Sequence, residues 1–152
     1  MIELKKPKPK DVAQMQNLVA PEVAKGVILP RSDDEVSTNI RSYVAACEDG
    51  KIVGFCALHI HTPQLAEVRS LIVDEKTRGR GVGSMMVKEL LKEAKFYELK
   101  SVFTLTYRRA FFENLGFYEI PKTKLPAQKI WADCAKCKLF PECNEIALIY
   151  DL

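Results

Sequence analysis

The sequence predicts an α/β (α+β) fold, in which a mixed central sheet of about six to seven strands is flanked by helices. Two observations predict this class. Short apolar runs of strand length alternate along the chain with segments whose apolar residues recur at helical spacing. In addition, the 152 residues are 47% hydrophobic and 28% charged, which is ordinary for one globular domain. We therefore expect a single domain over residues 1–152.

The N-terminal segment predicts a short strand and two helices. Residues 2–4 alternate apolar and polar side chains, as a strand does. Asp11 is placed to cap a helix, whose apolar face consists of Val12, Met15, Leu18 and Val19. Residues 26–30 end this helix, and residues 32–35 have the arrangement of a capping box, which predicts a second short helix.

The middle of the chain predicts a hairpin followed by a third strand. Two apolar runs, over 43–47 and 51–60, are joined by residues 48–50, where Asp-Gly is a strong turn signal. The apolar run over 65–74 predicts the next strand.

A long helix and several short elements complete the expected order. After a glycine-rich loop over 77–83, apolar residues recur at helical spacing, namely Met86, Val87, Leu90, Leu91, Ala94 and Tyr97. We expect strands over 101–106, 117–120 and 146–150, with a short helix over 109–115.

Charge and cysteine content exclude several classes of protein. The formal charge of +3 is too small to indicate a nucleic-acid partner. No apolar run approaches the roughly 20 residues of a membrane span, and residues 1–6 lack the apolar region of a signal peptide. The five cysteines are an odd number, which favours free thiols over a disulfide framework. We therefore expect a cytoplasmic protein with neither a nucleic-acid nor a membrane partner.

The loop after the third strand of the central region has the features of a phosphate-binding site. Three glycines at alternate positions over 79–83 precede a helix, and they let the backbone approach a ligand closely. The start of a helix offers unpaired N–H groups and a partial positive charge. Arg78 and Arg80 add two full charges, so the segment is suited to a phosphate group.

Two familiar nucleotide motifs do not fit this loop. A dinucleotide fingerprint needs G-x-G-x-x-G after the first strand, whereas this loop has G-x-G-x-G after several strands. A P-loop needs Gly-Lys followed by Ser or Thr, and the loop has no such lysine. A purely structural glycine turn is the remaining alternative from the residues alone.

The pattern Arg78-x-x-Gly81-x-Gly83 directly after a strand resembles the acyl-CoA signature of the GNAT superfamily of N-acetyltransferases. Residues 111–117 are similar to the helix-to-strand motif of that superfamily, and the two motifs stand in the usual order. The resemblance implies a GNAT core over about residues 1–120 and a cysteine-containing C-terminal extension over about 121–152. It also implies that acetyl-CoA is the cosubstrate. The residues that it implies for the cofactor are Leu71, Ile72, Val73, Arg78, Gly79, Arg80, Gly81, Val82, Gly83, Ser84 and Phe112.

Further segments resemble one branch of the superfamily, the short stand-alone bacterial N-acetylglutamate synthases. The segments are 29–32, 57–60, 66–71, 111–117 and 131–145. This resemblance implies direct transfer of the acetyl group to the α-amine of L-glutamate in a ternary complex, the first step of arginine biosynthesis. Open alternatives are acetylation of another small amine or a protein N-terminus, and a non-catalytic acyl-CoA-binding regulatory module. A homodimer is the oligomer that we consider beside a monomer.

Three residues are candidates for handling the acceptor amine. An amine must lose a proton before it attacks, so a carboxylate such as Glu67 is a candidate base. Because side chains alternate along a strand, Glu67, Arg69, Leu71 and Val73 are expected on one face. Arg69 and, in the loop before the second helix, Arg31 are candidate partners for substrate carboxylates. The alternatives are a solvated Glu67–Arg69 pair and an exposed loop charge at Arg31.

The candidate general acid of this chain differs from that of most members of the superfamily. Phe112 stands where most members have tyrosine, and phenylalanine cannot donate a proton. Tyr107, at the end of a predicted strand, is the candidate acid, with a packed aromatic residue as the alternative. His59 and His61 lie two apart on a predicted strand, a spacing that permits metal binding, a base, or polar packing.

The C-terminal cysteines have part of a zinc-site pattern. Cys134, Cys137 and Cys143 supply three local thiols, whereas a structural zinc site requires four ligands. We therefore assign no metal, with a zinc site on these cysteines and a compact thiol-rich loop as the open alternatives.

Overall fold

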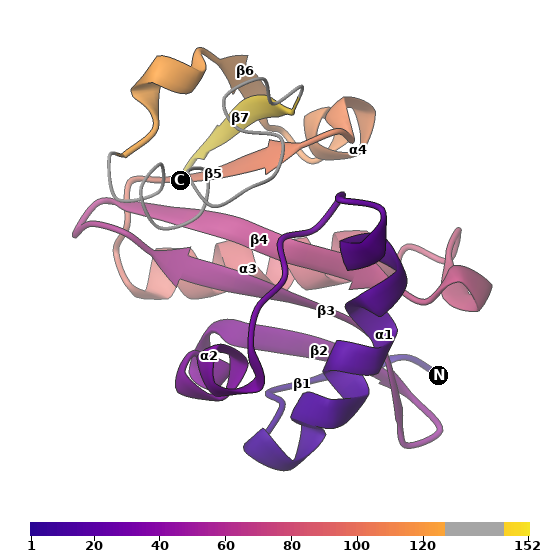
Figure 1. Cartoon of the computed structure of the whole chain (residues 1–152). Helices are drawn as coiled ribbons and strands as arrows, with labels where there is room; N and C mark the ends of the chain where they lie inside the picture. The colour runs from indigo at the N-terminus through magenta and orange to yellow at the C-terminus, as the bar shows by residue number, and fades with distance from the viewer. Residues whose placement is uncertain (127–144) are drawn as a thin grey trace. The chain divides into compact units, whose positions relative to one another are not determined.

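Figure 1 shows the computed structural model, which describes residues 1–126 and 145–152. Over these residues seven strands form a mixed sheet in the order β1-β2-β3-β4-β5-β7-β6. The strands are β1 (Glu3–Lys5), β2 (Tyr43–Glu48), β3 (Lys51–Ile60), β4 (Leu65–Val73), β5 (Ser101–Thr106), β6 (Tyr118–Ile120) and β7 (Ile146–Asp151). The helices are α1 (Val12–Ala24), α2 (Asp33–Thr38), α3 (Val82–Phe96) and α4 (Arg109–Asn114). The predicted fold class is confirmed.

Contacts divide the chain into two compact units. The first unit comprises residues 1–58 and 70–90, and the second comprises 59–69 and 91–152. Three elements, β3, β4 and α3, continue from one unit into the other. Among the described residues, no helix has the length and apolar character needed to cross a membrane.

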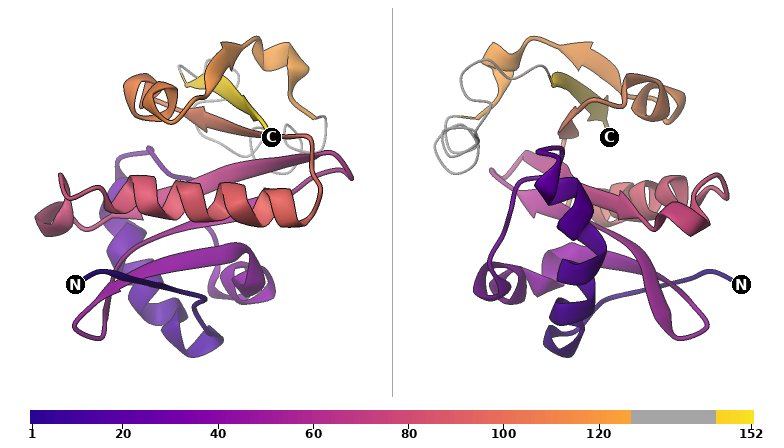
Figure 2. Two further views of the ribbon diagram at one scale, coloured as in Figure 1. Left: turned by 180° about the vertical axis from the view of Figure 1, so that it is seen from behind. Right: turned by 45° about the vertical axis from the view of Figure 1, so that its right-hand side comes forward.

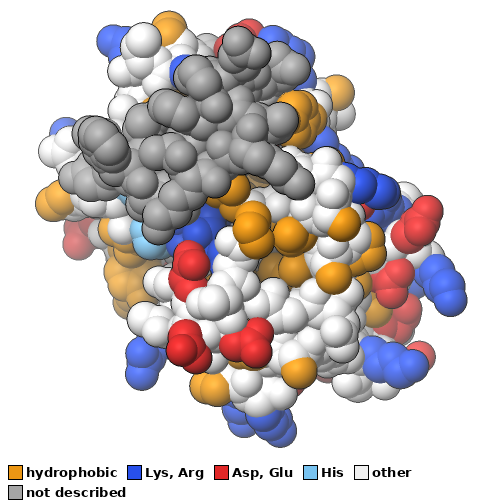
Figure 3. All heavy atoms as spheres, viewed as in Figure 1, with side chains coloured by type: hydrophobic (Ala, Val, Ile, Leu, Met, Phe, Trp, Pro, Cys, Tyr) orange, Lys and Arg blue, Asp and Glu red, His pale blue; other side chains and the backbone are white. Residues whose placement is uncertain are grey.

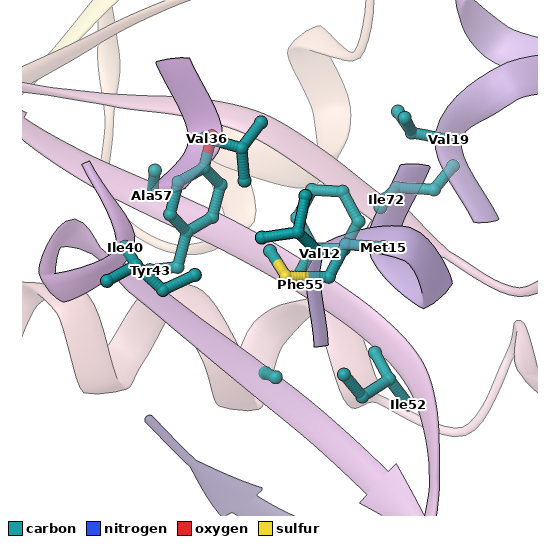
Figure 4. Packing of buried hydrophobic residues seen from close by; sticks show 11 residues of the cluster. Val12, Met15, Val19, Val36, Ile40, Tyr43, Ile52, Phe55, Ala57 and Ile72 are labelled. Carbon is teal, nitrogen blue, oxygen red and sulfur yellow. The ribbon is translucent and has the colours of Figure 1, made fainter. Parts of the chain in front are cut away.

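The first unit is built around an apolar cluster between helices and strands. Figure 4 shows the ring of Tyr43 beside Val36 of α2, and Phe55 of β3 beside Met15 of α1. The helical periodicity of α1 therefore places one of its faces in this cluster. Figure 2 shows α1 and α2 on the same side of the strands of the first unit. The buried members of the cluster are Val12, Met15, Val19, Val36, Ile40, Tyr43, Ala45, Ile52, Phe55, Ala57 and Ile72.

Helix ends follow the sequence signals in one case and depart from them in another. At α2 one half of the predicted capping box is confirmed, since the Ser32 hydroxyl accepts a hydrogen bond from the Glu35 N–H at 3.1 Å. Asp11 precedes α1, but its side chain makes no cap to that helix. Its Oδ2 instead accepts a bond of 2.8 Å from the backbone N–H of Lys8. The predicted role of Asp11 as the cap of α1 was wrong, because the short 3-10 turn Pro9–Asp11 competes for its carboxylate.

The predicted hairpin is formed by β2 and β3. Asp49 and Gly50 both have positive φ, 52° and 79°. A two-residue turn with both φ values positive matches the twist of the flanking strands. The Asp-Gly signal was therefore read correctly, down to the residues of the turn.

The second unit contains the start of β4 and the strands of the C-terminal half. Here β5 pairs with β4 in parallel and with β7 in antiparallel fashion, and β6 pairs with β7. Phe103 of β5 is buried with Leu125 and Ala147. One predicted helical residue lies outside its element, because Tyr97 follows the end of α3 and is 52% exposed.

Candidate active site

The glycine-rich loop of the first unit joins the end of β4 to the start of α3. Gly79 and Gly81 have φ values of 82° and 77°, in the left-handed region that favours glycine. The carbonyl of Gly81, the residue before α3, accepts the N–H of Met85 at 3.0 Å. The amides of residues 82–84 therefore have no acceptor in the preceding turn of the helix. They are placed to bind an anion, as the sequence predicts.

Two arginines flank this loop and are held by acidic residues of the same unit. Arg78 donates through Nε to the carbonyl of Val73 at 3.1 Å, and its guanidinium lies 3.6 Å from the Glu22 carboxylate. Arg80 forms a two-point pair with Glu48, with N···O distances of 3.0 and 2.6 Å. The hydrogen bond from Arg80 lowers the pKa of Glu48, and the same bond raises the pKa of Arg80. An incoming phosphate group would compete with Glu48 for Arg80.

The strand that leads into this loop is irregular. Ser70, in the middle of β4, has a φ of 59°. A residue in this conformation breaks the two-residue alternation of a strand. The positive φ of Ser70 interrupts the regular alternation on which the prediction of one face for Glu67, Arg69, Leu71 and Val73 depends. In the second unit, the parallel pairing of β4 with β5 runs from Leu65–Ser101 to Glu67–Phe103.

Glu67, the predicted base, lies in a buried contact with a histidine. Its side chain is 2% exposed, and its Oε1 lies 3.0 Å from Nε2 of His61, whose side chain is 4% exposed. The predicted solvated face for Glu67 is thus not what the structure shows. His61 follows the end of β3 and does not lie on the strand as predicted. Its ring also contacts His59 and Phe103.

The remaining predicted residues of the second unit lie in different surroundings. Arg69 is half-buried on β4, two residues after Glu67. Tyr107 follows the end of β5 and is 45% exposed. Phe112 is buried on α4 in edge-on contact with Phe111 and Phe117. The catalytic, substrate and cofactor roles of these residues stay predictions.

A pocket in the first unit brings Arg31 together with other residues that the sequence did not single out. Its polar lining residues are Gln16, Arg31, Tyr43 and Ser70. The apolar lining is Met15, Val19, Ile28, Leu29, Val36 and Phe55. The Arg31 side chain is 8% exposed and bonds to Glu35 at 2.7 Å, so the alternative of an exposed loop charge is wrong. Figure 3 shows hydrophobic side chains beside α1 on this face, with acidic side chains over α2.

Three of the five cysteines, Cys134, Cys137 and Cys143, fall outside the described residues. Within residues 1–126 and 145–152, no cluster of three or more His, Cys, Asp or Glu could hold a metal ion. Cys56 is buried and Cys47 is half-buried, and burial raises the pKa of Cys47. The zinc alternative for the C-terminal cysteines therefore stays a prediction.

Comparison with known proteins decides the family. The model of the acetyltransferase (GNAT) family matches residues 13–117, which include the glycine-rich loop, β4 and α4. The chain belongs to this family. As a GNAT member it is an N-acetyltransferase.

Curated relatives of this GNAT chain carry two kinds of name. An uncharacterized N-acetyltransferase of Chlorobaculum tepidum is 34% identical over 142 residues, which cover 93% of this chain and 91% of that protein. An amino-acid acetyltransferase of Mycobacterium tuberculosis is 40% identical over 79 residues, covering 52% of this chain and 45% of the relative. An amino-acid acetyltransferase of Haemophilus ducreyi is 28% identical, and the match covers 78% of this chain and 28% of that protein. The chain thus spans less than half the length of these two amino-acid acetyltransferases.

Solved structures with the same fold include enzymes in complex with coenzyme A. The N-acetylglutamate synthase of Neisseria gonorrhoeae, complexed with coenzyme A and N-acetyl-glutamate, has a TM-score of 0.88 at 19% identity and covers all of this chain and 35% of its own. Rv2747 of M. tuberculosis, in complex with CoA, has a TM-score of 0.83 at 25% identity and covers 99% of both chains. The similarity to the Neisseria synthase shows that this chain has the same fold.

Proposed function

We propose that this GNAT chain transfers the acetyl group of acetyl-CoA to the α-amine of L-glutamate by direct attack in a ternary complex. The amine nitrogen forms a bond to the acetyl carbonyl carbon as the carbon–sulfur bond breaks. The ammonium form of glutamate loses two protons overall, of which the departing thiolate takes one and solvent the other. The products are N-acetylglutamate and coenzyme A.

The glycine-rich loop supports the binding of acetyl-CoA. The amides of residues 82–84 and the side chain of Arg80 would bind the phosphate groups of the cofactor. The backbone of residues 71–73 would hold the pantetheine arm, as the resemblance implies. The CoA complexes of Rv2747 and the Neisseria synthase are consistent with this assignment.

The buried carboxylate of Glu67 is the observation that carries the proposal. An α-ammonium group must be deprotonated before attack, and a carboxylate acting directly or through water removes such a proton. Glu67 is 2% exposed and has a histidine at 3.0 Å, an environment unlike that of a surface glutamate. Glu67 is therefore the proposed base, and a strand N–H near Ile72 or Val73 is the proposed partner of the developing oxyanion.

Arginines of this chain are proposed to bind the substrate carboxylates. L-glutamate carries two carboxylates, each of which an arginine can bind in a two-point geometry. Arg69 follows Glu67 by two residues on β4, and Arg31 lines the pocket of the first unit. Tyr107 is the proposed acid for the thiolate. Because a CoA thiol is a fair leaving group, removal of the Tyr107 hydroxyl should lower the rate less than removal of the Glu67 carboxylate.

Thiol release from acetyl-CoA tests the assignment of the acceptor. The full chain is assayed with L-glutamate, L-glutamine, other amino acids, a polyamine and a peptide with a free N-terminus. We expect turnover with L-glutamate and little or none with the polyamine or the peptide. Turnover confined to the polyamine or the peptide would reject glutamate and leave the acetyltransferase class intact.

One observation favours a second acceptor class. Six of the ten residues that line the pocket of the first unit are apolar. An amine whose body is less polar than glutamate would bury apolar surface there, with a carboxylate on Arg31. Higher kcat/KM with such an amino acid than with L-glutamate in the same assay would establish this alternative.

A further inference from the structure

The contact between His61 and Glu67 is the most buried ionisable pair that the described residues place near the proposed chemistry. Nε2 of His61 lies 3.0 Å from Oε1 of Glu67, and the two side chains are 4% and 2% exposed. Burial of a carboxylate without a donor would be costly. His61 supplies such a donor from within the same unit.

Three neighbouring groups fix the position of the His61 ring. The turn after β3 is closed by bonds from the N–H groups of His61 and Thr62 to the Leu65 carbonyl, at 2.9 and 3.1 Å. The ring stacks on Phe103 of β5, with centroids 5.5 Å apart, and meets the edge of His59 at 4.6 Å. His61 therefore presents Nε2 to Glu67, and among the described residues the titratable groups that it contacts are Glu67 of β4 and His59 of β3.

The protonation states of the two groups decide which of them donates the hydrogen bond. An ionised carboxylate only accepts hydrogen bonds, so a bond to it requires the proton on Nε2 of His61. The carboxylate has about four lone-pair positions, so Glu67 can accept a proton from an ammonium group while His61 holds it in place.

We propose that His61 is a positioning residue, which keeps the Glu67 carboxylate ionised and oriented as the proton acceptor of the transfer reaction. This role rests on the proposed function of Glu67 as the base. The proton moves from the N–H bond of the substrate ammonium to a carboxylate oxygen, and it then passes to solvent. His61 itself gives up no proton in the cycle, since its N–H donates to the carboxylate throughout.

A double-mutant cycle tests whether His61 acts through Glu67. Glu67→Gln should lower kcat by about 10²-fold or more, the scale of a general base. His61→Leu, which removes the donor but keeps bulk, should lower kcat at least about 10-fold, with the KM for acetyl-CoA changed less than about 2-fold. The double variant should be no slower than Glu67→Gln alone. Multiplied effects in the double variant would show that His61 acts independently and would overturn the proposal.

A conservative variant and a pH profile separate positioning from packing. His61→Gln keeps an N–H donor without a titrating ring, and it should retain kcat within about 3-fold of the wild type. In His61→Leu the acid limb of the kcat/KM profile should move to higher pH, because the ionised carboxylate has lost its donor. An unmoved limb, or equal losses in the Gln and Leu variants, would overturn the proposal. Urea unfolding of each variant shows that the compared proteins are folded.

Failure of the glutamate assignment is distinguishable from failure of this inference. The cycle is run with whichever acceptor gives the highest turnover in the amine panel. If that acceptor is not L-glutamate but the cycle shows coupling, the positioning role stands and only the substrate changes. If Glu67→Gln keeps full activity with that acceptor, both the base and its positioning residue are rejected.

Discussion

Arg69 is the arginine that the strand places beside the proposed base. It is half-buried on β4, two residues after Glu67. Hydrogen bonds between charged groups contribute about 1.5–3 kcal/mol, which corresponds to roughly 10- to 100-fold in binding. We therefore predict that Arg69→Ala raises the KM for L-glutamate by at least about 10-fold and changes the KM for acetyl-CoA by less than about 2-fold.

Steady-state kinetics with each substrate varied in turn provide the check. Arg109→Ala is the matched control, because Arg109 is an arginine of the same unit that pairs with Glu119 on the surface. It should leave both KM values unchanged. Equal increases in the two KM values of Arg69→Ala would rule out a specific role for Arg69 in binding the amine.

Glu48 competes with the cofactor for Arg80. The pair is exposed, and Arg80 bonds to both carboxylate oxygens of Glu48. Glu48→Gln removes the competing charge, so the KM for acetyl-CoA should fall by about two- to five-fold, the scale of an exposed ion pair. Titration of the wild type and the variant with acetyl-CoA measures the difference.

The pH dependence of this effect has a definite sign. Arg80 lowers the pKa of Glu48, so the pair is present above the ordinary glutamate range and is lost as pH falls through the lowered pKa. The difference between wild type and Glu48→Gln should therefore shrink toward acid pH. A difference that grows on acidification would contradict the competition.

At the scale of elements, the approach of β3 to β4 depends on Gly54. A Cβ at this position would lie 2.8 Å from the carbonyl oxygen of Ile72 and 3.1 Å from the methyl group of Met86. The first neighbour is backbone, so the strands must separate to accept a side chain. We predict that Gly54→Ala lowers the free energy of unfolding by about 1–3 kcal/mol, as other overpacked sites do.

Urea unfolding measures this loss, with Gly50→Asn as the control. Gly50 has open space around it, so an added side chain meets no atom there, although its φ of 79° strains a residue with a Cβ. The control should therefore lower the free energy of unfolding by less than Gly54→Ala does, because it adds backbone strain without a clash. A neutral Gly54→Ala would show that the two strands can move apart at no cost.

Ser70 sets the irregularity of β4. Its φ of 59° is unfavourable for residues with a Cβ and most of all for β-branched ones. Ser70→Val should therefore lower the free energy of unfolding by about 1–3 kcal/mol, whereas Ser70→Gly should change it by less than about 1 kcal/mol. Equal effects of the two substitutions in urea unfolding would contradict strain at this position.

These elements also show what sequence patterns can and cannot predict. The Asp49-Gly50 turn and the Ser32 cap follow from local chemistry, and both were predicted correctly. The bend at Ser70 was missed, because serine is not a residue that signals positive φ. The contact of His61 with Glu67 joins two elements across a turn, so the spacing of His59 and His61 alone could not predict it.

The sequence likewise predicts one part of the candidate site, the glycine-rich loop, and not another, the pocket around Arg31. The glycine-rich loop is one continuous segment with a strong pattern, and the structure places it at the start of α3 as predicted. The pocket around Arg31 combines residues of α1, α2 and three strands. No spacing in the sequence marks Gln16 or Ser70 as members of that pocket, because their proximity arises only from the packing of these elements.

At the scale of the whole molecule, one strand connects the two sets of functional residues. β4 carries Glu67 and Arg69 in the second unit, and it continues through residues 71–73 to the glycine-rich loop of the first. Cofactor and base are thus assigned to one continuous piece of chain.

The initial rate of thiol release from acetyl-CoA by the purified full chain, measured with and without L-glutamate, tests the central claim most directly. The control is Glu67→Gln under the same conditions. We predict saturable, glutamate-dependent release by the wild type, formation of N-acetylglutamate, and a rate at least about 10²-fold lower in the variant. Release that does not depend on L-glutamate, or that survives unchanged in Glu67→Gln, would contradict the account.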